Sequence, residues 1–122
     1  MRPALAMLAL LVLLSGCSDE EGARTVRMTG MGEFEPAALH VPVGTTVTWT
    51  NHSDRSHTIS TAARDPATKQ FAQVPRAARP WRSGDVQPGA VFRRRLTVPG
   101  RYVYYCRYHA RDQMIGTIVV EP

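Results

Sequence analysis

The chain has 122 residues, which is enough for one domain with a single hydrophobic core and too few for two. It is basic, with 15 lysines and arginines against 10 acidic residues and a formal net charge of +5. In a cytosolic protein this charge would favour nucleic acid. The first residues predict an export signal, so anionic lipid or an acidic partner protein fits the charge better, and no nucleic acid partner is expected.

Residues 1–16 predict that export signal. Arg2 supplies a positive charge, and residues 4–14 form an apolar run that is too short to span a bilayer as a stable helix. The run ends in Leu-Ser-Gly before Cys17, which resembles the lipobox of bacterial lipoproteins, where the cysteine is acylated and becomes the N-terminus. We therefore expect a lipid on Cys17, residues 17–24 as a tether, and anchoring on the periplasmic, extracytoplasmic face of a membrane. An ordinary cleaved signal with an incidental cysteine is the alternative.

The two cysteines constrain the chemistry. If Cys17 carries lipid, Cys106 has no partner for a disulfide. A lone thiol in an oxidising compartment needs protection, and metal ligation is one form of it. A disulfide between the two cysteines is the alternative, and it would tie a flexible leader to the core.

The residues from 25 onward alternate between strand and turn patterns. We expect strands at 25–29, 39–43, 46–50, 57–60, 91–98, 102–106 and 114–120. Residues 61–90 carry four prolines and several arginines without a lasting period, so they predict a long surface excursion. No amphipathic helix is expected. Short strands separated by glycine and proline predict an all-β antiparallel sandwich or barrel over residues 25–122.

One arginine breaks the alternation of its strand. Arg94 has the same parity as Phe92 and Leu96, so strict alternation would point it inward. Either a bulge shifts the register or the guanidinium group reaches the rim of the barrel.

The residues with metal-binding chemistry are concentrated near the C-terminus. Cys106, His109 and Met114 fall within nine residues, at the end of one strand, in a short loop and at the start of the next strand. Two histidines and a cysteine with a weak axial methionine form the ligand set of a blue-copper site. A second histidine from elsewhere in the chain is therefore required.

Three histidines are candidates for that position. His40 lies within an expected strand, and His52 lies in an expected turn, so exposed positions are expected for both. His57 follows the turn and opens the next strand, which is a suitable place for a ligand at the end of a barrel. We favour His57.

Taken together, these motifs resemble the plastocyanin and pseudoazurin branch of the cupredoxins. The matching segments cover the chain from about residue 25 to its end: Phe34-x-Pro36, residues 44–51, residues 57–59, Ser83-Gly84 with Gly89 and Phe92, and Gly100-x-Tyr102-x-Tyr104-x-Cys106-x-x-His109-x4-Met114-x-Gly116. The resemblance implies a Greek-key β-barrel and one type 1 copper ion that cycles between Cu(I) and Cu(II). It carries the ligand roles to His57, Cys106, His109 and Met114.

The chain departs from the family pattern at three positions beside these ligands. Gln113 stands where relatives usually have glycine, Tyr108 where many have proline, and Thr58 where asparagine often ties the two ligand segments together. These differences bear on the reduction potential, because packing and hydrogen bonds around the thiolate set it.

The resemblance implies a carrier of single electrons between larger redox proteins and not an enzyme. Four protein ligands fill the metal, whereas a metal catalyst needs an open position. His109 is expected to be the electron port, and Tyr105 is either a second route or a simple surface aromatic. Partners are unnamed donor and acceptor proteins, acidic ones among the candidates, and a monomer is expected.

A protein that binds and delivers copper is the main alternative. Such a protein would carry several exposed soft ligands, and only Met28 and Met31 hint at them.

Overall fold

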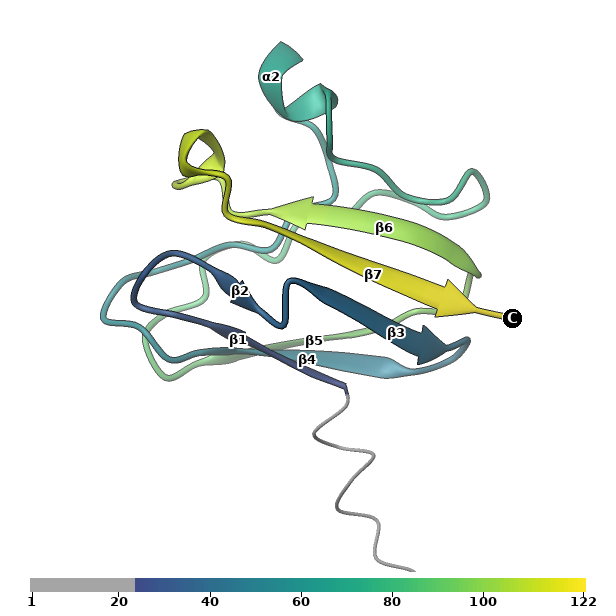
Figure 1. Ribbon diagram of the computed structural model, residues 1–122, viewed down its shortest axis with the longest axis horizontal. Helices are drawn as coiled ribbons and strands as arrows, with labels where there is room; N and C mark the ends of the chain where they lie inside the picture. Colours follow the sequence, from purple (N-terminus) through teal and green to yellow (C-terminus); the bar gives the residue numbers. More distant parts are fainter. Residues whose placement is uncertain (1–23) are drawn as a thin grey trace, which may run out of the picture.

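Two β-sheets face each other in the computed structural model, which describes residues 24–122 (Figure 1). The first sheet has the strand order β2 (Phe34–Glu35), β1 (Thr25–Met28), β4 (Thr46–Asn51) and β5 (Val91–Arg95). The second has the order β3 (Ala38–Pro42), β7 (Ile115–Glu121) and β6 (Gly100–Tyr105). The helical elements of the described chain are short: α2 (Pro66–Lys69) and the 3₁₀ turn η1 (Ala110–Asp112). The expected all-β sandwich is confirmed.

The strand pairing is mixed, which corrects the expectation of a purely antiparallel arrangement. β1 pairs with β4 in parallel, and so does β3 with β7, while the other pairs are antiparallel. Hairpins produce antiparallel neighbours, whereas parallel neighbours need a longer crossover. Here the chain crosses between the two sheets after β2 and returns before β4, so strands that are distant in sequence become neighbours.

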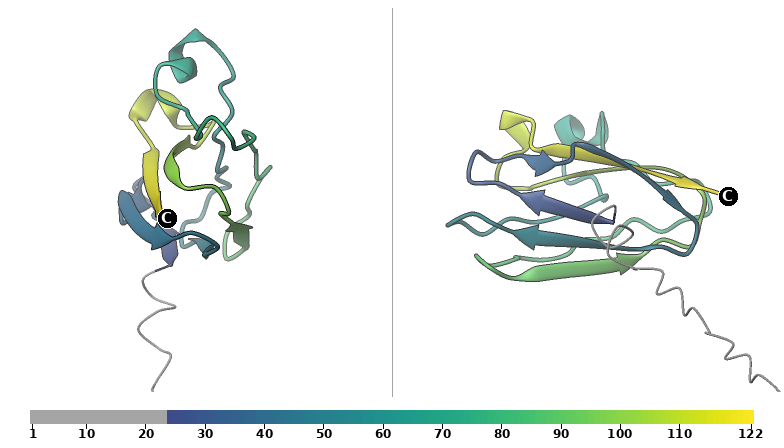
Figure 2. Two further views of the ribbon diagram at one scale, coloured as in Figure 1. Left: turned by 90° about the vertical axis from the view of Figure 1, so that its right-hand side faces the viewer. Right: turned by 60° about the horizontal axis from the view of Figure 1, so that its bottom comes forward.

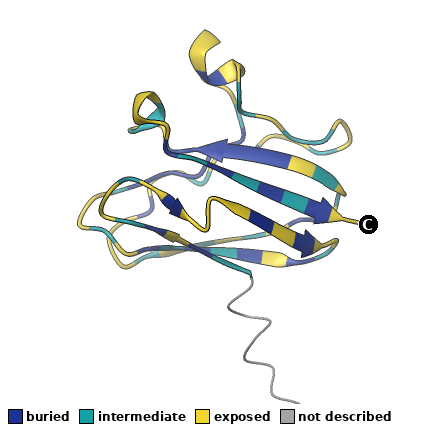
Figure 3. Cartoon of the chain, viewed as in Figure 1, coloured by how far each residue is buried: buried dark blue, intermediate teal, exposed yellow. Residues whose placement is uncertain are grey.

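The alternation in β4 places the core between the sheets. Val47 and Trp49 are fully buried, whereas Thr46, Thr48 and Thr50 lie on the more exposed face, and Figure 3 shows the same alternation on β3 and β7. The ring of Trp49 meets the ring of Tyr104 from β6 edge to face, with centroids 5.4 Å apart. This contact joins the two sheets, since each ring comes from a different one.

Arg94 keeps the inward parity that the sequence indicates. The β4–β5 register runs without a bulge through the pair Val47–Arg94, and Arg94 is half-buried. Its guanidinium carbon lies 5.1 Å from the centroid of the Trp81 ring. The structure therefore shows no bulge. Instead, the guanidinium group of Arg94 reaches the rim of the barrel and lies over the face of an aromatic ring.

Residues 57–60 do not form the expected strand. His57 and Ser60 make single bridges, to Val86 and to Arg82 and Tyr105 respectively, and the segment is buried between them. Such isolated bridges fix positions without a continuous ladder. The proline-rich excursion at 61–90 supplies partners only at single points.

The excursion rises from the second sheet and carries α2 beyond the edge of β6 (Figures 1 and 2). Asp65 caps α2 by accepting a hydrogen bond from the backbone N–H of Thr68 at 2.8 Å. No helix of the described residues is long and apolar enough to cross a membrane. The expected signal at 1–16 and lipid site at Cys17 lie outside the described residues.

Candidate metal centre

The loop between β6 and β7 is closed by its own backbone. The N–H of Cys106 donates to the carbonyl of Met114 at 3.0 Å, and the N–H of Met114 donates to the carbonyl of His109 at 3.1 Å. The N–H of His109 in turn donates to the carbonyl of Cys106 at 3.2 Å. These three bonds hold the cysteine, the loop histidine and the methionine on one compact turn at the end of the sandwich.

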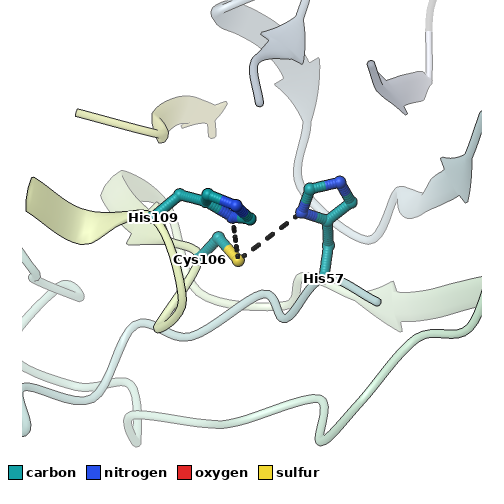
Figure 4. Close-up of side chains that lie close together, drawn as sticks. All are labelled: His57, Cys106 and His109. Atoms are coloured by element: carbon teal, nitrogen blue, oxygen red, sulfur yellow. Dashed lines mark hydrogen bonds between the residues drawn. The ribbon is translucent and has the colours of Figure 1, made fainter. Parts of the chain in front are cut away.

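Three of the four expected ligand side chains converge on one point (Figure 4). Cys106 Sγ lies 3.7 Å from Nδ1 of His57 and 3.6 Å from Nδ1 of His109. The potential ligand atoms of the three residues all lie within 4.8 Å of one another. One ion with bond lengths of about 2.0–2.3 Å, which first-row metals form with imidazole nitrogen and thiolate sulfur, would bridge atoms at these separations. The donor set fits a soft metal such as copper.

The burial of the three residues is uneven. Cys106 and His57 are fully buried, while His109 is half-buried and forms the outer side of the cluster. Burial lowers the pKa of His57, and the neighbouring charges of His109 and Arg55 lower it further. A lowered pKa keeps the imidazole neutral, which is the form that binds a metal.

Thr58 ties the two ligand segments together. Its backbone N–H donates to Cys106 Sγ at 3.4 Å, and its hydroxyl oxygen accepts the N–H of Arg107 at 2.9 Å. In the family pattern this position is often an asparagine with the same task. The threonine hydroxyl therefore provides the link that the sequence had left in question.

Met114 is also buried, with 1% of its surface exposed. Its backbone contacts both Cys106 and His109 through the bonds described above. The residue before it, Gln113, adopts a left-handed conformation with φ 59° and ψ 36°. This conformation explains why glycine suits the position in relatives, because glycine adopts it without steric cost.

Tyr108, the residue before the loop histidine, is fastened by its side chain. Its hydroxyl donates to the carboxylate of Asp85 at 2.6 Å, and the guanidinium carbon of Arg107 lies 4.8 Å from its ring centroid. The hydrogen bond with Asp85 is the first cause of the raised pKa of Tyr108. This contact connects the ligand loop to the 61–90 excursion without the rigidity of a proline.

Two residues of the family-matching segments, Asn51 and Ser83, were given no role by the sequence analysis and position the ligand segments. The buried amide of Asn51 donates to the carbonyls of Val86 and Arg55 at 2.9 and 2.6 Å, and the N–H of His57 donates to the same Val86 carbonyl at 3.1 Å. The hydroxyl of Ser83 accepts the N–H of Ile59 at 2.8 Å. The local motifs contain both residues, but their hydrogen bonds join distant parts of the chain, so the roles themselves appear only in the structure.

Tyr105 is not a surface aromatic. It is 1% exposed, its hydroxyl donates to the carbonyl of Ala62 at 2.8 Å, and Phe71 meets its ring edge to face. The excursion therefore covers the side chain next to Cys106. The two histidines that were set aside, His40 and His52, are both exposed.

A cleft of about 170 Å³ opens over the outer side of the cluster. His57 and His109 form part of its lining together with Arg55, Asp112 and the turn at residues 30–32. The half-buried imidazole of His109 is thus reached from the surface at this end of the sandwich.

Comparison with known proteins gives a consistent answer. Residues 21–121 match the family of copper binding proteins described as the plastocyanin/azurin family. The chloroplastic plastocyanin of Hordeum vulgare is 30% identical to the chain over 117 residues, and that of Oryza sativa subsp. indica is 30% identical over 120 residues. Each match covers 96% of this chain and 73% of the plastocyanin sequence.

Solved structures of amicyanin share the fold. The reduced Cu(I) form of a proline-to-glycine mutant superposes with a TM-score of 0.63 at 28% identity, covering 82% of this chain and 83% of that one. The oxidised state of a proline-to-alanine mutant gives a TM-score of 0.64 at 28% identity, with 83% and 84% covered. The chain accordingly belongs to the plastocyanin/azurin family of copper-binding proteins, the cupredoxins, and its cofactor is copper.

Proposed function

We propose that the protein is a type 1 copper protein that carries single electrons between redox partners and catalyses no reaction of its own. The observation that carries this proposal is the pair of Nδ1 atoms that face one buried cysteine sulfur at 3.6 and 3.7 Å. Two imidazoles and a thiolate in this arrangement are the ligands of blue-copper electron-transfer sites. Membership of a copper-binding family supports the same conclusion.

The ligands would be Nδ1 of His57, Sγ of Cys106 and Nδ1 of His109, with the thioether of Met114 as a weaker fourth donor. The copper supplies the one-electron couple. The chain holds the ligands in place through the loop's own backbone bonds and through Thr58, so little rearrangement accompanies a change of charge. His109, reached from the cleft, would be the point at which electrons enter and leave.

The test is the visible and electron paramagnetic resonance spectrum of the purified protein after addition of Cu(II), followed by a potentiometric titration. We expect an intense blue band and a reversible one-electron couple. Cys106→Ser should lose the blue colour completely, because the charge-transfer band requires the thiolate sulfur. A variant that stays blue would contradict the ligand assignment.

A protein that delivers copper remains the second candidate. Met28 is fully buried in the core, but Met31 is 86% exposed and lines the cleft over His57 and His109. A thioether there could meet an incoming Cu(I) ion, which is soft. A transfer protein would hold colourless Cu(I) and would release it to a chelator within the time of mixing, whereas the proposed carrier retains its ion.

The partners are proposed to be redox proteins with acidic docking surfaces, met by a monomeric carrier. Arg107 and Arg111 lie in the ligand loop on either side of His109, and both are exposed. Opposite charge on the partner would raise the association rate at low salt and lose that gain as the Debye length falls to about 8–10 Å. Stopped-flow electron transfer at varied salt should show a shallower salt dependence for Arg107→Gln/Arg111→Gln. An unchanged slope would remove these arginines from partner steering.

The location is proposed to be the extracytoplasmic face of a membrane, with the lipid on Cys17 as the anchor. The support is the signal-like run and the cysteine that ends it. Export would also explain why a buried lone thiol such as Cys106 is kept as a metal ligand.

A further inference from the structure

A second cleft lies beside the cluster, separate from the one over His57 and His109. Its volume is about 320 Å³, and it is lined by Thr58, Ser60, Arg64, Arg82, Gly84, Tyr105 and Arg107. Its three arginines come from three different segments: the start of the excursion, the return of the excursion, and the ligand loop. Positive charge from distant parts of the chain is thus gathered around one concave site.

Within the described residues, the arginines of this cleft form no salt bridge with an acidic side chain. Among residues 24–122, none of the three guanidinium groups has a carboxylate oxygen within 4.0 Å. The carboxylate of Asp65 accepts hydrogen bonds from the backbone and the hydroxyl of Thr68, and that of Asp85 accepts the hydroxyl of Tyr108. These two carboxylates are therefore engaged in other hydrogen bonds, and the carboxylate of Asp112, which lines the neighbouring cleft with Arg64 and Arg107, forms no salt bridge with either arginine.

Thr58 adds an unused donor to the lining. Its side chain is buried, with 3% of the residue exposed, and its oxygen accepts the N–H of Arg107. The hydroxyl proton itself goes to no acceptor among the described residues, whereas the hydroxyl of Ser60 is bound to the carbonyl of Ala62. The hydroxyl of Thr58 is therefore available to donate to a group bound in the cleft while its oxygen keeps the bond from Arg107.

We propose that this cleft is an oxyanion site that takes a phosphate or carboxylate group between the guanidinium groups of Arg64, Arg82 and Arg107. The planar fork of a guanidinium group matches two oxygens of either anion, and the resulting bonds are charge-assisted. The hydroxyl of Thr58 would donate a further hydrogen bond to the same anion. The cleft is large enough for a small free anion or for an acidic side chain of another protein.

An anion bound in the cleft would change the reduction potential of the copper centre. Thr58 contacts the anion through its hydroxyl and Cys106 Sγ through its backbone N–H, and Arg107 is the residue after the cysteine. Negative charge at this position favours Cu(II) over Cu(I), so a bound anion lowers the reduction potential. By reciprocity the oxidised protein binds the anion more tightly than the reduced protein does. This coupling rests on the proposed function, whereas anion binding itself does not.

The test is calorimetric titration of the copper-loaded protein, oxidised and reduced, with inorganic phosphate and separately with a polyglutamate peptide. We expect saturable binding that weakens about tenfold or more in Arg64→Gln/Arg82→Gln, since charge-assisted hydrogen bonds are lost. The matched control is Arg93→Gln/Arg101→Gln, which removes the same charge from exposed positions outside the cleft. The control should bind as the wild type does.

The outcomes separate the alternatives. If phosphate binds, the ligand of the cleft is a free anion. If only the peptide binds, the ligand is an acidic side chain of a partner protein. No saturable binding of either probe, or equal weakening in both double variants, would overturn the site. A potential that saturating phosphate leaves unchanged would overturn the coupling. A wild-type protein without a blue band would contradict the proposed function and leave the binding result standing.

Discussion

At the scale of single residues, Gln113 holds the one positive-φ backbone among the non-glycine residues of the described chain. Its φ of 59° brings a Cβ close to the carbonyl oxygen, at a cost of about 1–2 kcal/mol. Replacement by glycine removes that cost but adds freedom to the unfolded chain. We therefore expect Gln113→Gly to raise the free energy of unfolding by about 0.5–1 kcal/mol, as measured by urea denaturation of the metal-free protein.

The control for this change is Gln113→Ala, which removes the exposed amide and keeps the Cβ. It should leave the stability unchanged or lower it. If alanine stabilised the protein as much as glycine does, backbone strain would not be the cause.

The neighbouring methionine allows a test of a different kind. Met114 is buried, and leucine has a similar volume, so Met114→Leu should preserve the fold and the copper. Loss of the fourth donor lowers the coordination number, which Cu(I) tolerates better than Cu(II), and we therefore expect a blue protein with a higher reduction potential by potentiometric titration. Met28→Leu, which changes a second buried methionine in β1, is the control and should leave the potential unchanged. Complete loss of copper would mean that Met114 does more than tune the site.

At the scale of elements, β6 and β7 position the ligand loop, and the packing between them beside the loop depends on a glycine. Tyr104 on β6 lies opposite Gly116 on β7, and a Cβ on the glycine would lie closer than 3.0 Å to the ring and hydroxyl of the tyrosine. The ring cannot move aside, because it is fully buried and packed against Phe34 and Trp49. The pair therefore sets the spacing of the two strands just before they diverge into the loop.

Gly116→Ala should lower the free energy of unfolding by about 2–3 kcal/mol, the range found for overpacked cores. Chemical denaturation measures the change, and the copper spectrum of the folded fraction reports whether the loop is displaced. Gly30→Ala is the control, since a Cβ there would meet nothing within 4 Å. Equal stability of both variants would show that the strands can separate at Gly116 without cost.

The elements also show why prediction from the sequence succeeded in part. The strands with clear alternation, such as β4, and the loop with closely spaced Cys106 and His109 are local patterns, and the structure has them where the sequence indicates. The burial of Tyr105 and the irregular path of residues 57–60 depend on the excursion packing over β6, which leaves no local signal. The parallel pairing of β1 with β4 is likewise set by the crossover between sheets and not by either strand alone.

At the scale of the whole molecule, β1 runs from the start of the domain toward the end that carries the candidate copper site. The strand runs from Thr25 to Met28, where it lies beside Asn51, and the turn at residues 30–32 then lines the cleft over His109. The chain therefore enters the domain from the end of β1 that faces away from the site (Figure 1). An anchor at the N-terminus would leave the electron port directed away from the membrane and open to partners.

The anchor itself gives the last prediction. Cys17→Ala removes the only thiol that a lipobox at this position could acylate, so the protein should move from the membrane fraction to the soluble fraction or remain as an unprocessed precursor. Fractionation with immunodetection measures the change, and mass spectrometry of the wild type should find the lipid on an N-terminal Cys17. Residues 18–24 join Cys17 to the start of β1, and none of them belongs to the cluster of His57, Cys106 and His109. The copper spectrum of the soluble variant should therefore equal that of the wild type. Processed Cys17→Ala protein that stays in the membrane fraction would refute lipidation as the means of attachment.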